Sequence, residues 1–229
     1  MSGILYGVGV GPGDPELLTV KAWRLISGAS TIAYLCANGG QSTALHIAQP
    51  FLPDSYTSIA IDMPMRVERE PAQAAYDQGC EKISKVLHGG SDVIFLCEGD
   101  PFFYGSFMYV FERLIKNHKV MVVPGVTSIS AASAQLQRPL VERDEVLKVL
   151  PATMPAENLK SELATASAAA IVKVGRHIDK VKAVLSELDL LDKATAIEHA
   201  TRPNQIIRSL NEIKSNTLPY FTTIIVRRK

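Results

Sequence analysis

The chain lacks the features that mark several common protein classes. No apolar run reaches the roughly 18 residues needed to cross a bilayer, and the three cysteines, Cys36, Cys80 and Cys97, form no CxxC pair. We therefore expect no membrane-spanning helix, no disulfide framework and no metal site, with buried free thiols at Cys36 and Cys97. The net charge is only +1, which does not favour a nucleic-acid or membrane-surface partner. No basic leader precedes the first strand pattern, so we expect a cytoplasmic protein.

An alternation of apolar runs with amphipathic segments is what the sequence does contain. With 229 residues and 47% hydrophobic content, the chain can build two modest cores. In the first half, strands are predicted at residues 4–10, 31–35, 58–61, 93–97 and 119–123, with helices between them. This alternation is typical of a largely parallel α/β sheet with crossover helices.

The second half continues the alternation. Its predicted strands are residues 145–150, 168–174, 194–198 and 220–226, and its predicted helices are residues 156–164, 177–188 and 205–213. We therefore predict two α/β domains, residues 1–124 and 125–229, with a cleft between them.

The first strand runs into the loop GPGDPE, residues 11–16. A GxGxxG dinucleotide loop would need glycine where Pro12 or Asp14 stands, and no lysine completes a P-loop. The two prolines also remove amide donors. The loop therefore suits a rigid backbone wall for a ligand that is not mainly phosphate.

The strand at residues 93–97 is apolar without alternation, as in a strand buried on both faces. It is followed by EGDPFFYGS, residues 98–106, which brings two carboxylates and three aromatic rings to the carboxyl end of the strand. Ligands bind at that edge in open α/β sheets, and Gly99 lets the backbone come close to one. Considered alone, the loop fits equally well an ordinary turn in which Asp100 caps its own backbone.

A third loop, VPGVTSISAA at residues 123–132, completes a combination that resembles the tetrapyrrole methyltransferase family. Members of that family methylate uroporphyrinogen and precorrin carbons with S-adenosylmethionine. The resemblance spans essentially the whole chain and implies two α/β domains, the cofactor between them and a homodimer. The runs EGDPFFYGSFMY, VLPATMP and PYFTTIIV resemble the branch that methylates C-20 of precorrin-2 or its cobalt form. We expect the three loops to converge on the cofactor, with S-adenosylhomocysteine as its product.

The resemblance also implies which residues bind the cofactor. Val174 stands where many relatives have methionine and keeps an apolar contact, and Ala200 matches the small residue before a threonine. Asp100 would anchor the ribose or the amino acid, unless it only caps its turn. The full implied set is Pro12, Glu98, Gly99, Asp100, Phe103, Thr127, Ser128, Val174 and Ala200.

Methyl transfer from an activated sulfonium needs positioning more than acid–base chemistry, so we predict no indispensable nucleophile. Tyr104 is a candidate for steering the substrate or relaying a proton, beside a plain packing role. A tetrapyrrole with eight carboxylates needs guanidinium partners, and Arg66 and Arg69 lie in a proline-bounded loop that is either a lid or simply solvated. The arginines at predicted loops or strand ends are Arg66, Arg69, Arg138, Arg176 and Arg202.

His177 and His199 are interpreted as structural histidines rather than cobalt ligands. The resemblance implies a C-20 methyltransferase of precorrin-2 or its cobalt form in cobalamin biosynthesis. Alternatives on the same fold are uroporphyrinogen-III, diphthamide and ribosomal RNA methyltransferases, the last disfavoured by the near-neutral charge. A non-catalytic nucleotide-sensing module is disfavoured by the failed GxGxxG pattern and the absent P-loop lysine.

Overall fold

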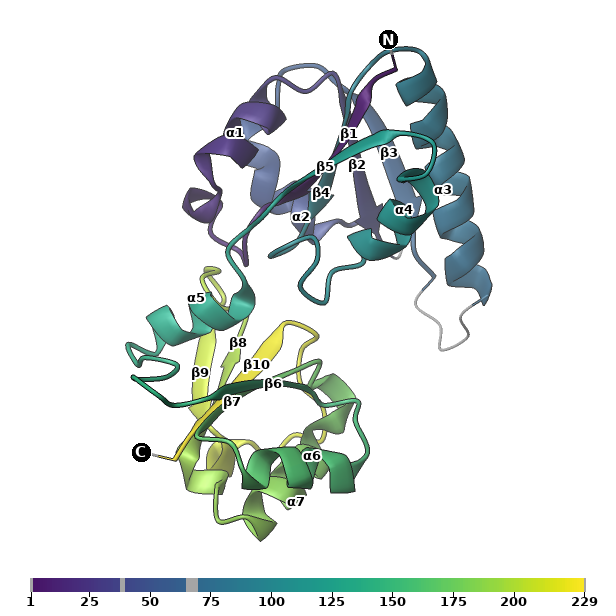
Figure 1. Cartoon of the computed structure of the whole chain (residues 1–229). Coiled ribbons are helices and arrows are strands. Elements are labelled where there is room, and N and C mark those ends of the chain that lie inside the picture. The colour runs from purple at the N-terminus through teal and green to yellow at the C-terminus, as the bar shows by residue number, and fades with distance from the viewer. Residues whose placement is uncertain (1, 38–39, 65–69, 229) are drawn as a thin grey trace. The chain divides into compact units, whose positions relative to one another are not determined.

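Two units, each built on one five-stranded sheet, make up the computed structural model, which describes residues 2–37, 40–64 and 70–228 (Figure 1). The units are Met1–Thr127 and Ser128–Lys229. Helices accompany both sheets, so the predicted α/β class is confirmed. No helix in the described ranges is both long and apolar enough to cross a membrane.

The sheet of the first unit has the order β3-β2-β4-β1-β5, and every neighbouring pair is parallel. This confirms the alternation predicted from the sequence. Its strands are β1 (Ile4–Gly9), β2 (Thr31–Cys36), β3 (Thr57–Asp62), β4 (Val93–Cys97) and β5 (Lys119–Val123). Its helices are α1 (Val20–Ser27), α2 (Thr43–Ala48), α3 (Glu70–His88) and α4 (Phe107–Leu114).

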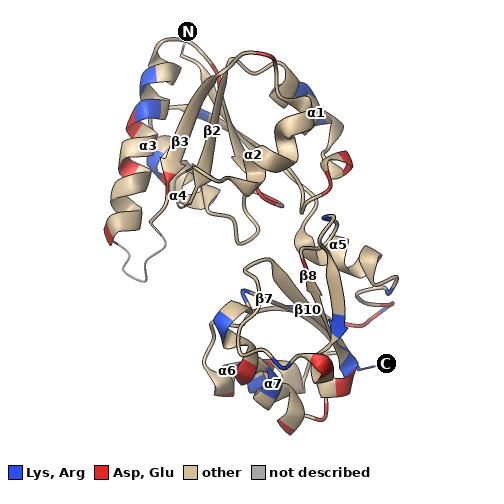
Figure 2. Cartoon of the chain, turned by 180° about the vertical axis from the view of Figure 1, so that it is seen from behind, with Lys and Arg blue, Asp and Glu red and all other residues tan. Residues whose placement is uncertain are grey.

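Strand β4 lies at the centre of this sheet and is buried at all five positions, as its unbroken apolar run predicts. Phe95 faces the core formed with α3 and α4 and stacks on Phe107 at 5.4 Å between ring centroids. Ile94 and Leu96 face the core formed with α1 and α2. Helices therefore cover both faces of the sheet, and α3 carries Lys, Asp and Glu along its length (Figure 2).

The helix starts follow from local side-chain chemistry. Thr19 Oγ1 accepts a hydrogen bond from Ala22 N at 3.1 Å, and Ser42 Oγ accepts one from Leu45 N at 3.3 Å. Both are N-caps that satisfy an otherwise unpaired helical amide.

All three cysteines are free and buried, which confirms the free thiols expected at Cys36 and Cys97. Burial raises the pKa of the Cys80 thiol to about 11 and raises the pKa of Cys97 well above its ordinary value. A thiol with a raised pKa holds little of the reactive thiolate. These cysteines therefore act as small apolar core residues.

The second unit has a mixed sheet with the order β6-β7-β10-β8-β9. β6 and β7 are parallel, whereas β10 runs antiparallel to β7 and β8, and β9 runs antiparallel to β8. Its strands are β6 (Leu147–Pro151), β7 (Ala168–Val172), β8 (Ala194–Glu198), β9 (Ile206–Ser209) and β10 (Thr222–Arg227). Its helices are α5 (Ser128–Gln135), α6 (Ala156–Ala164) and α7 (Ile178–Glu187).

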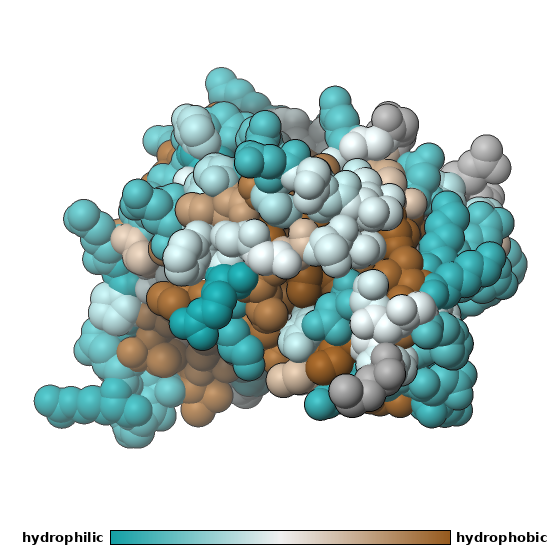
Figure 3. Space-filling model, turned by 90° about the horizontal axis from the view of Figure 1, so that it is seen from above, coloured by the Kyte–Doolittle hydropathy of each residue, from teal (hydrophilic) through white to brown (hydrophobic). Residues whose placement is uncertain are grey.

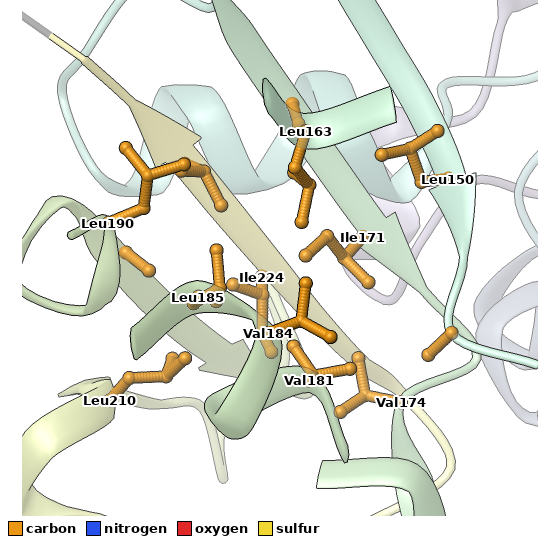
Figure 4. Close-up of a cluster of buried hydrophobic side chains, with 14 of the residues drawn as sticks. Leu150, Leu163, Ile171, Val174, Val181, Val184, Leu185, Leu190, Leu210 and Ile224 are labelled. Atoms are coloured by element: carbon orange, nitrogen blue, oxygen red, sulfur yellow. The ribbon is translucent and has the colours of Figure 1, made fainter. Parts of the chain in front are cut away.

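One face of this second sheet packs on α6 and α7, and Figure 4 shows the side chains of that core converging from helix and strand. The other face packs on α5 through Ile129, Ala131 and Ala132. The small side chains of α5 bring its backbone close to the sheet, as expected from its alanine-rich sequence.

The helix predicted over residues 205–213 is wrong. Ile206–Ser209 forms the edge strand β9, and a single 3₁₀ turn, Leu210–Glu212, follows it. Two β-branched isoleucines and pairing with β8, with Glu198 opposite Ile206, override the weak helical pattern. The remaining short 3₁₀ turns are Pro15–Leu17, Gln49–Phe51, Gly175–His177 and Leu191–Lys193.

Candidate functional site

The first two loops of the first unit are joined by their backbones at the carboxyl edge of the parallel sheet. Gly99 N donates a hydrogen bond to Gly11 O at 2.8 Å, and Gly11 N donates to Gly99 O at 3.3 Å. Val10 N also donates to Cys97 O at 2.8 Å. An isolated antiparallel bridge between Gly11 and Gly99 therefore joins the two loops, beyond the last parallel pair of β1 and β4.

The third loop packs directly against this bridge. A Cβ atom added at Gly125 would lie 2.0 Å from Gly99 O, and one added at Gly9 would lie 2.7 Å from the Gly125 Cα atom. Real side chains never approach backbone that closely, so glycine is required at both positions. The three loops therefore meet within the first unit, through Gly9 and Gly125, which the sequence analysis did not single out. That they converge on the cofactor stays a prediction.

Asp100 holds the second and third loops together. Its Oδ1 atom accepts hydrogen bonds from Phe102 N at 2.9 Å and Phe103 N at 3.1 Å, and its Oδ2 atom accepts one from Gly125 N at 3.0 Å. The capping interpretation is therefore confirmed, together with a tie to Gly125 that the sequence did not predict. A carboxylate offers about four lone-pair sites, so a ligand contact of Asp100 stays a prediction.

Gly99 leaves open the position that a side chain would occupy. Its φ is +61°, in the left-handed region that favours glycine, and the nearest atom to an added Cβ would be Val126 O at 3.8 Å. Beside it, Glu98 is exposed and Pro12 is half-buried. A bound molecule can therefore approach the main chain of Gly99, which is the fit that a ligand held by backbone requires.

The aromatic residues after Asp100 lie at the surface. Phe102, Phe103 and Tyr104 are 46%, 39% and 43% exposed, and the Phe103 and Tyr104 rings meet edge to face at 5.3 Å. Tyr104 has a φ of +56°, an uncommon conformation for a residue with a side chain. Hydrophobic residues lie exposed between hydrophilic ones on the face seen in Figure 3.

In the second unit, the loops after β7 and β8 lie at the same edge of the sheet, because both strands run antiparallel to β10 between them. The segment entering β10 contacts both loops: Leu218 N donates to Gly175 O at 3.2 Å, and His199 N donates to Phe221 O at 2.8 Å. The structure thus brings the predicted residues Val174 and Ala200 to one edge of the second sheet.

The side chains of these two residues do not face solvent. Val174 is fully buried and lies among core residues near Val181 (Figure 4), and Ala200 is also buried. The apolar ligand contact expected of Val174 is therefore not available to its side chain. A ligand contact at either position would have to come from the main chain.

Arg202 and His199 both lie beside the Phe221 ring at this edge. The Arg202 guanidinium lies 4.2 Å from the centroid of the Phe221 ring, and the His199 ring lies 6.3 Å from the same centroid. Burial, then the charge of Arg202, lowers the pKa of His199, while Glu198 opposes the shift. His199 Nδ1 is buried and has no hydrogen-bond partner among the described residues.

The other predicted contacts fall into different parts of the chain. Thr127 ends the first unit and Ser128 begins α5 in the second, whereas Arg66 and Arg69 lie outside the described residues. Arg176 is exposed, and burial, then Lys180 and Arg176, lowers the pKa of His177. Within the described ranges, no three or more His, Cys, Asp or Glu side chains gather where they could hold a metal ion.

The family model described as Tetrapyrrole (Corrin/Porphyrin) Methylases matches residues 4–214. The chain belongs to the tetrapyrrole methylase family. This confirms the resemblance carried by the three loops.

Curated relatives in the tetrapyrrole methylase family agree with the predicted branch. A precorrin-2 C(20)-methyltransferase of Sinorhizobium sp is 36% identical, over 99% of this chain and 97% of the relative. A cobalt-precorrin-2 C(20)-methyltransferase of Salmonella typhimurium is 30% identical, over 100% of this chain and 98% of the relative. The cobalamin biosynthesis protein CobIJ of Mycobacterium tuberculosis is 41% identical over 96% of this chain, but the chain spans only 45% of that protein's length.

Solved structures of tetrapyrrole methylases share the fold. A cobalt precorrin-4 methyltransferase, CbiF, matches with a TM-score of 0.75 at 21% identity, over 98% of this chain and 94% of the other. The uroporphyrin-III C-methyltransferase of Thermus thermophilus, solved with S-adenosylhomocysteine, matches with a TM-score of 0.68 at 22% identity, over 98% of this chain and 97% of the other. At these identities the likeness establishes the two-unit α/β fold.

Proposed function

We propose that this protein transfers a methyl group from S-adenosylmethionine to C-20 of precorrin-2 or of its cobalt form in cobalamin biosynthesis. The observation that supports this proposal best is the meeting of three glycine loops at the carboxyl edge of the first sheet. That edge is where ligands of open α/β sheets bind. The two relatives of matching length, both named for C-20 methylation, point to the same reaction.

The cofactor would be held mainly by main chain. The open position above Gly99 admits a ligand. Pro12, Glu98, Asp100 and Phe103, from the same two loops, are proposed as further contacts. S-adenosylmethionine supplies a methyl group already activated on a sulfonium, and S-adenosylhomocysteine is the product. Thr127 at the end of the first unit, Ser128 at the start of α5, and the backbone at Val174 and Ala200 are proposed as further cofactor contacts.

The residues of this chain would bind the cofactor and the substrate, orient them toward each other and exclude water. Orientation alone can supply roughly 7–11 kcal/mol in well-aligned reactions, so the proposal assigns no nucleophile. Tyr104, exposed beside Phe103, is the candidate for guiding the substrate or relaying a proton, its Oη atom accepting one proton while its own passes on to solvent.

The substrate would be recognised through its carboxylates. Arg176 and Arg202 lie in the loops that follow β7 and β8. The planar guanidinium group can bind both oxygens of a carboxylate. Arg66 and Arg69 are proposed for the same role. We further propose a cytoplasmic homodimer, by analogy with the family.

The experiment is product analysis combined with ligand titration. Purified protein is incubated with S-adenosylmethionine and either precorrin-2 or cobalt-factor II, and mass spectrometry should detect the addition of one methyl group. Calorimetry should detect micromolar binding of S-adenosylhomocysteine, both in the wild type and in Lys160→Ala, which removes only a surface ion pair with Glu187. Methylation of uroporphyrinogen-III alone, or no binding at micromolar concentrations, would contradict the proposal.

A further inference from the structure

The turn that follows β8 is strained. His199 has a φ of +51° and Thr201 a φ of +69°, although neither is glycine. A β-branched residue with positive φ is a genuine outlier, and such conformations persist only where the surroundings enforce them. The buried Ala200 lies between the two, so its main-chain direction depends on whatever holds Thr201.

Gln205 is the side chain that holds Thr201. Its Oε1 atom accepts a hydrogen bond from Thr201 N at 2.7 Å, and its Nε2 atom donates one to Gln135 Oε1 on α5 at 3.0 Å. The backbone of the same turn is closed by Arg202 N to His199 O and by Gln205 N to Arg202 O, each at 3.0 Å. The amide of Gln205 therefore joins the turn to α5, and because Thr201 N only donates, the oxygen of that amide must face it.

We infer that Gln205 is a positioning residue for ligand binding by the turn at residues 199–201. It holds the Thr201 amide and thereby the main chain of Ala200 in the conformation that meets the cofactor. This inference rests on the proposed function, because Ala200 is a cofactor contact only there. Holding the turn before binding removes part of the ordering cost of binding. Without Gln205 the turn can relax to ordinary backbone angles, and the cofactor must order it again.

Three variants separate this role from general packing. Gln205→Leu removes the acceptor for Thr201 N, whereas Gln205→Glu keeps an acceptor and loses the donor to Gln135. Gln135→Leu is the matched control. It removes the acceptor for Gln205 Nε2 and leaves the hydrogen bond from Thr201 N to Gln205 Oε1. Gln205 is only partly buried and Gln135 is exposed, so all three variants should fold, which thermal melting verifies.

Calorimetry with S-adenosylhomocysteine measures the effect. Losing one such bond should weaken binding about tenfold in Gln205→Leu, while Gln205→Glu and Gln135→Leu should stay within about threefold of the wild type. In steady-state kinetics, the KM for S-adenosylmethionine should rise in Gln205→Leu and the KM for the tetrapyrrole should not. Wild-type affinity in a folded Gln205→Leu, or an equal loss in Gln205→Leu and Gln205→Glu, would overturn the inference.

Hydrogen exchange without ligand distinguishes this inference from the proposed function. The Thr201 amide should exchange faster in Gln205→Leu than in the wild type or Gln135→Leu. Unchanged exchange would overturn the positioning role even if the protein is a methyltransferase. Faster exchange in a protein that does not bind S-adenosylhomocysteine would uphold the hold on Thr201 and overturn the proposed function.

Discussion

The loops at the proposed binding edge of each sheet are held in place in different ways. In the first unit, Gly9 and Gly125 pack directly on the backbone of the neighbouring loops, with no room for a side chain at either position. In the second unit, the turn after β8 takes left-handed conformations on His199 and Thr201. There the strain is held by a side chain from outside the turn.

The difference predicts where each unit is sensitive to change. Adding an atom at Gly9 or Gly125 should break the junction, because the neighbouring atoms are backbone and cannot move aside cheaply. The turn in the second unit should instead lose its conformation when Gln205 is removed. It should tolerate a smaller residue at Thr201, where the backbone is strained. The predictions below test this contrast, beginning with the largest effect.

Gly125→Ala should have the largest effect. The added Cβ would lie 2.0 Å from Gly99 O, which forces the second and third loops apart and destabilises the fold by about 3 kcal/mol. Urea unfolding measures the change, and calorimetry should show that binding of S-adenosylhomocysteine is lost.

Gly28→Ala is the matched control, because its added Cβ would meet only Arg24 O at an ordinary 3.6 Å. Its stability should stay within about 0.5 kcal/mol of the wild type. Equal stabilities for the two variants would show that the glycine junction is not tightly packed.

Asp100→Ala should come second. It leaves the amides of Phe102, Phe103 and Gly125 without their acceptor, which costs about 2 kcal/mol. Asp100→Asn keeps one oxygen and should cost about half as much in the same unfolding measurement. If Asp100→Asn were as damaging as Asp100→Ala, the charge rather than the hydrogen-bond geometry would be decisive.

An exchange of residue types should give opposite signs in the two units. Gly99→Ala meets no close atom but must adopt a φ of +61°, so we expect a loss of about 1 kcal/mol. Thr201→Gly relieves a φ of +69° and should raise stability by up to about 1 kcal/mol. Thermal melting of both variants tests the contrast, and a fall in stability for Thr201→Gly would remove it.

The smallest effect concerns pH and the histidines. Burial, then the charge of His88, lowers the pKa of His118, whose Nε2 atom lies 2.7 Å from Ser84 Oγ. Between that lowered pKa and the ordinary value of 6.5, the unfolded chain binds more protons than the folded one, so stability falls as the pH falls.

His118→Gln should flatten this slope in melting curves taken from pH 7 down to pH 5. His199→Gln should flatten it less, because Glu198 opposes the lowering of the pKa of His199. If His199→Gln flattened the slope of stability against pH more than His118→Gln, the pH dependence would belong mainly to the second unit, which would contradict this prediction.

The sequence predicted what depends on neighbouring residues. The buried strand β4 follows from its unbroken apolar run, and the structure confirms it. The motif loops at residues 11–16 and 98–106 were found because strand ends bearing glycine and carboxylates are visible in the sequence.

What the sequence missed depends on contacts between distant residues. Nothing local indicates that Asp100 accepts a hydrogen bond from Gly125 N, or that Gln205 reaches Gln135 seventy positions away. The edge strand β9 was mistaken for a helix because its partner β8 decides its conformation. Such pairings are set by tertiary structure, which overrides weak local preference.

A crystal structure of the S-adenosylhomocysteine complex tests the central claim most directly. The account predicts the ligand against the main chain of Gly99, beside the Gly11 bridge and the loop at Gly125. A ligand bound away from the three joined loops would contradict it.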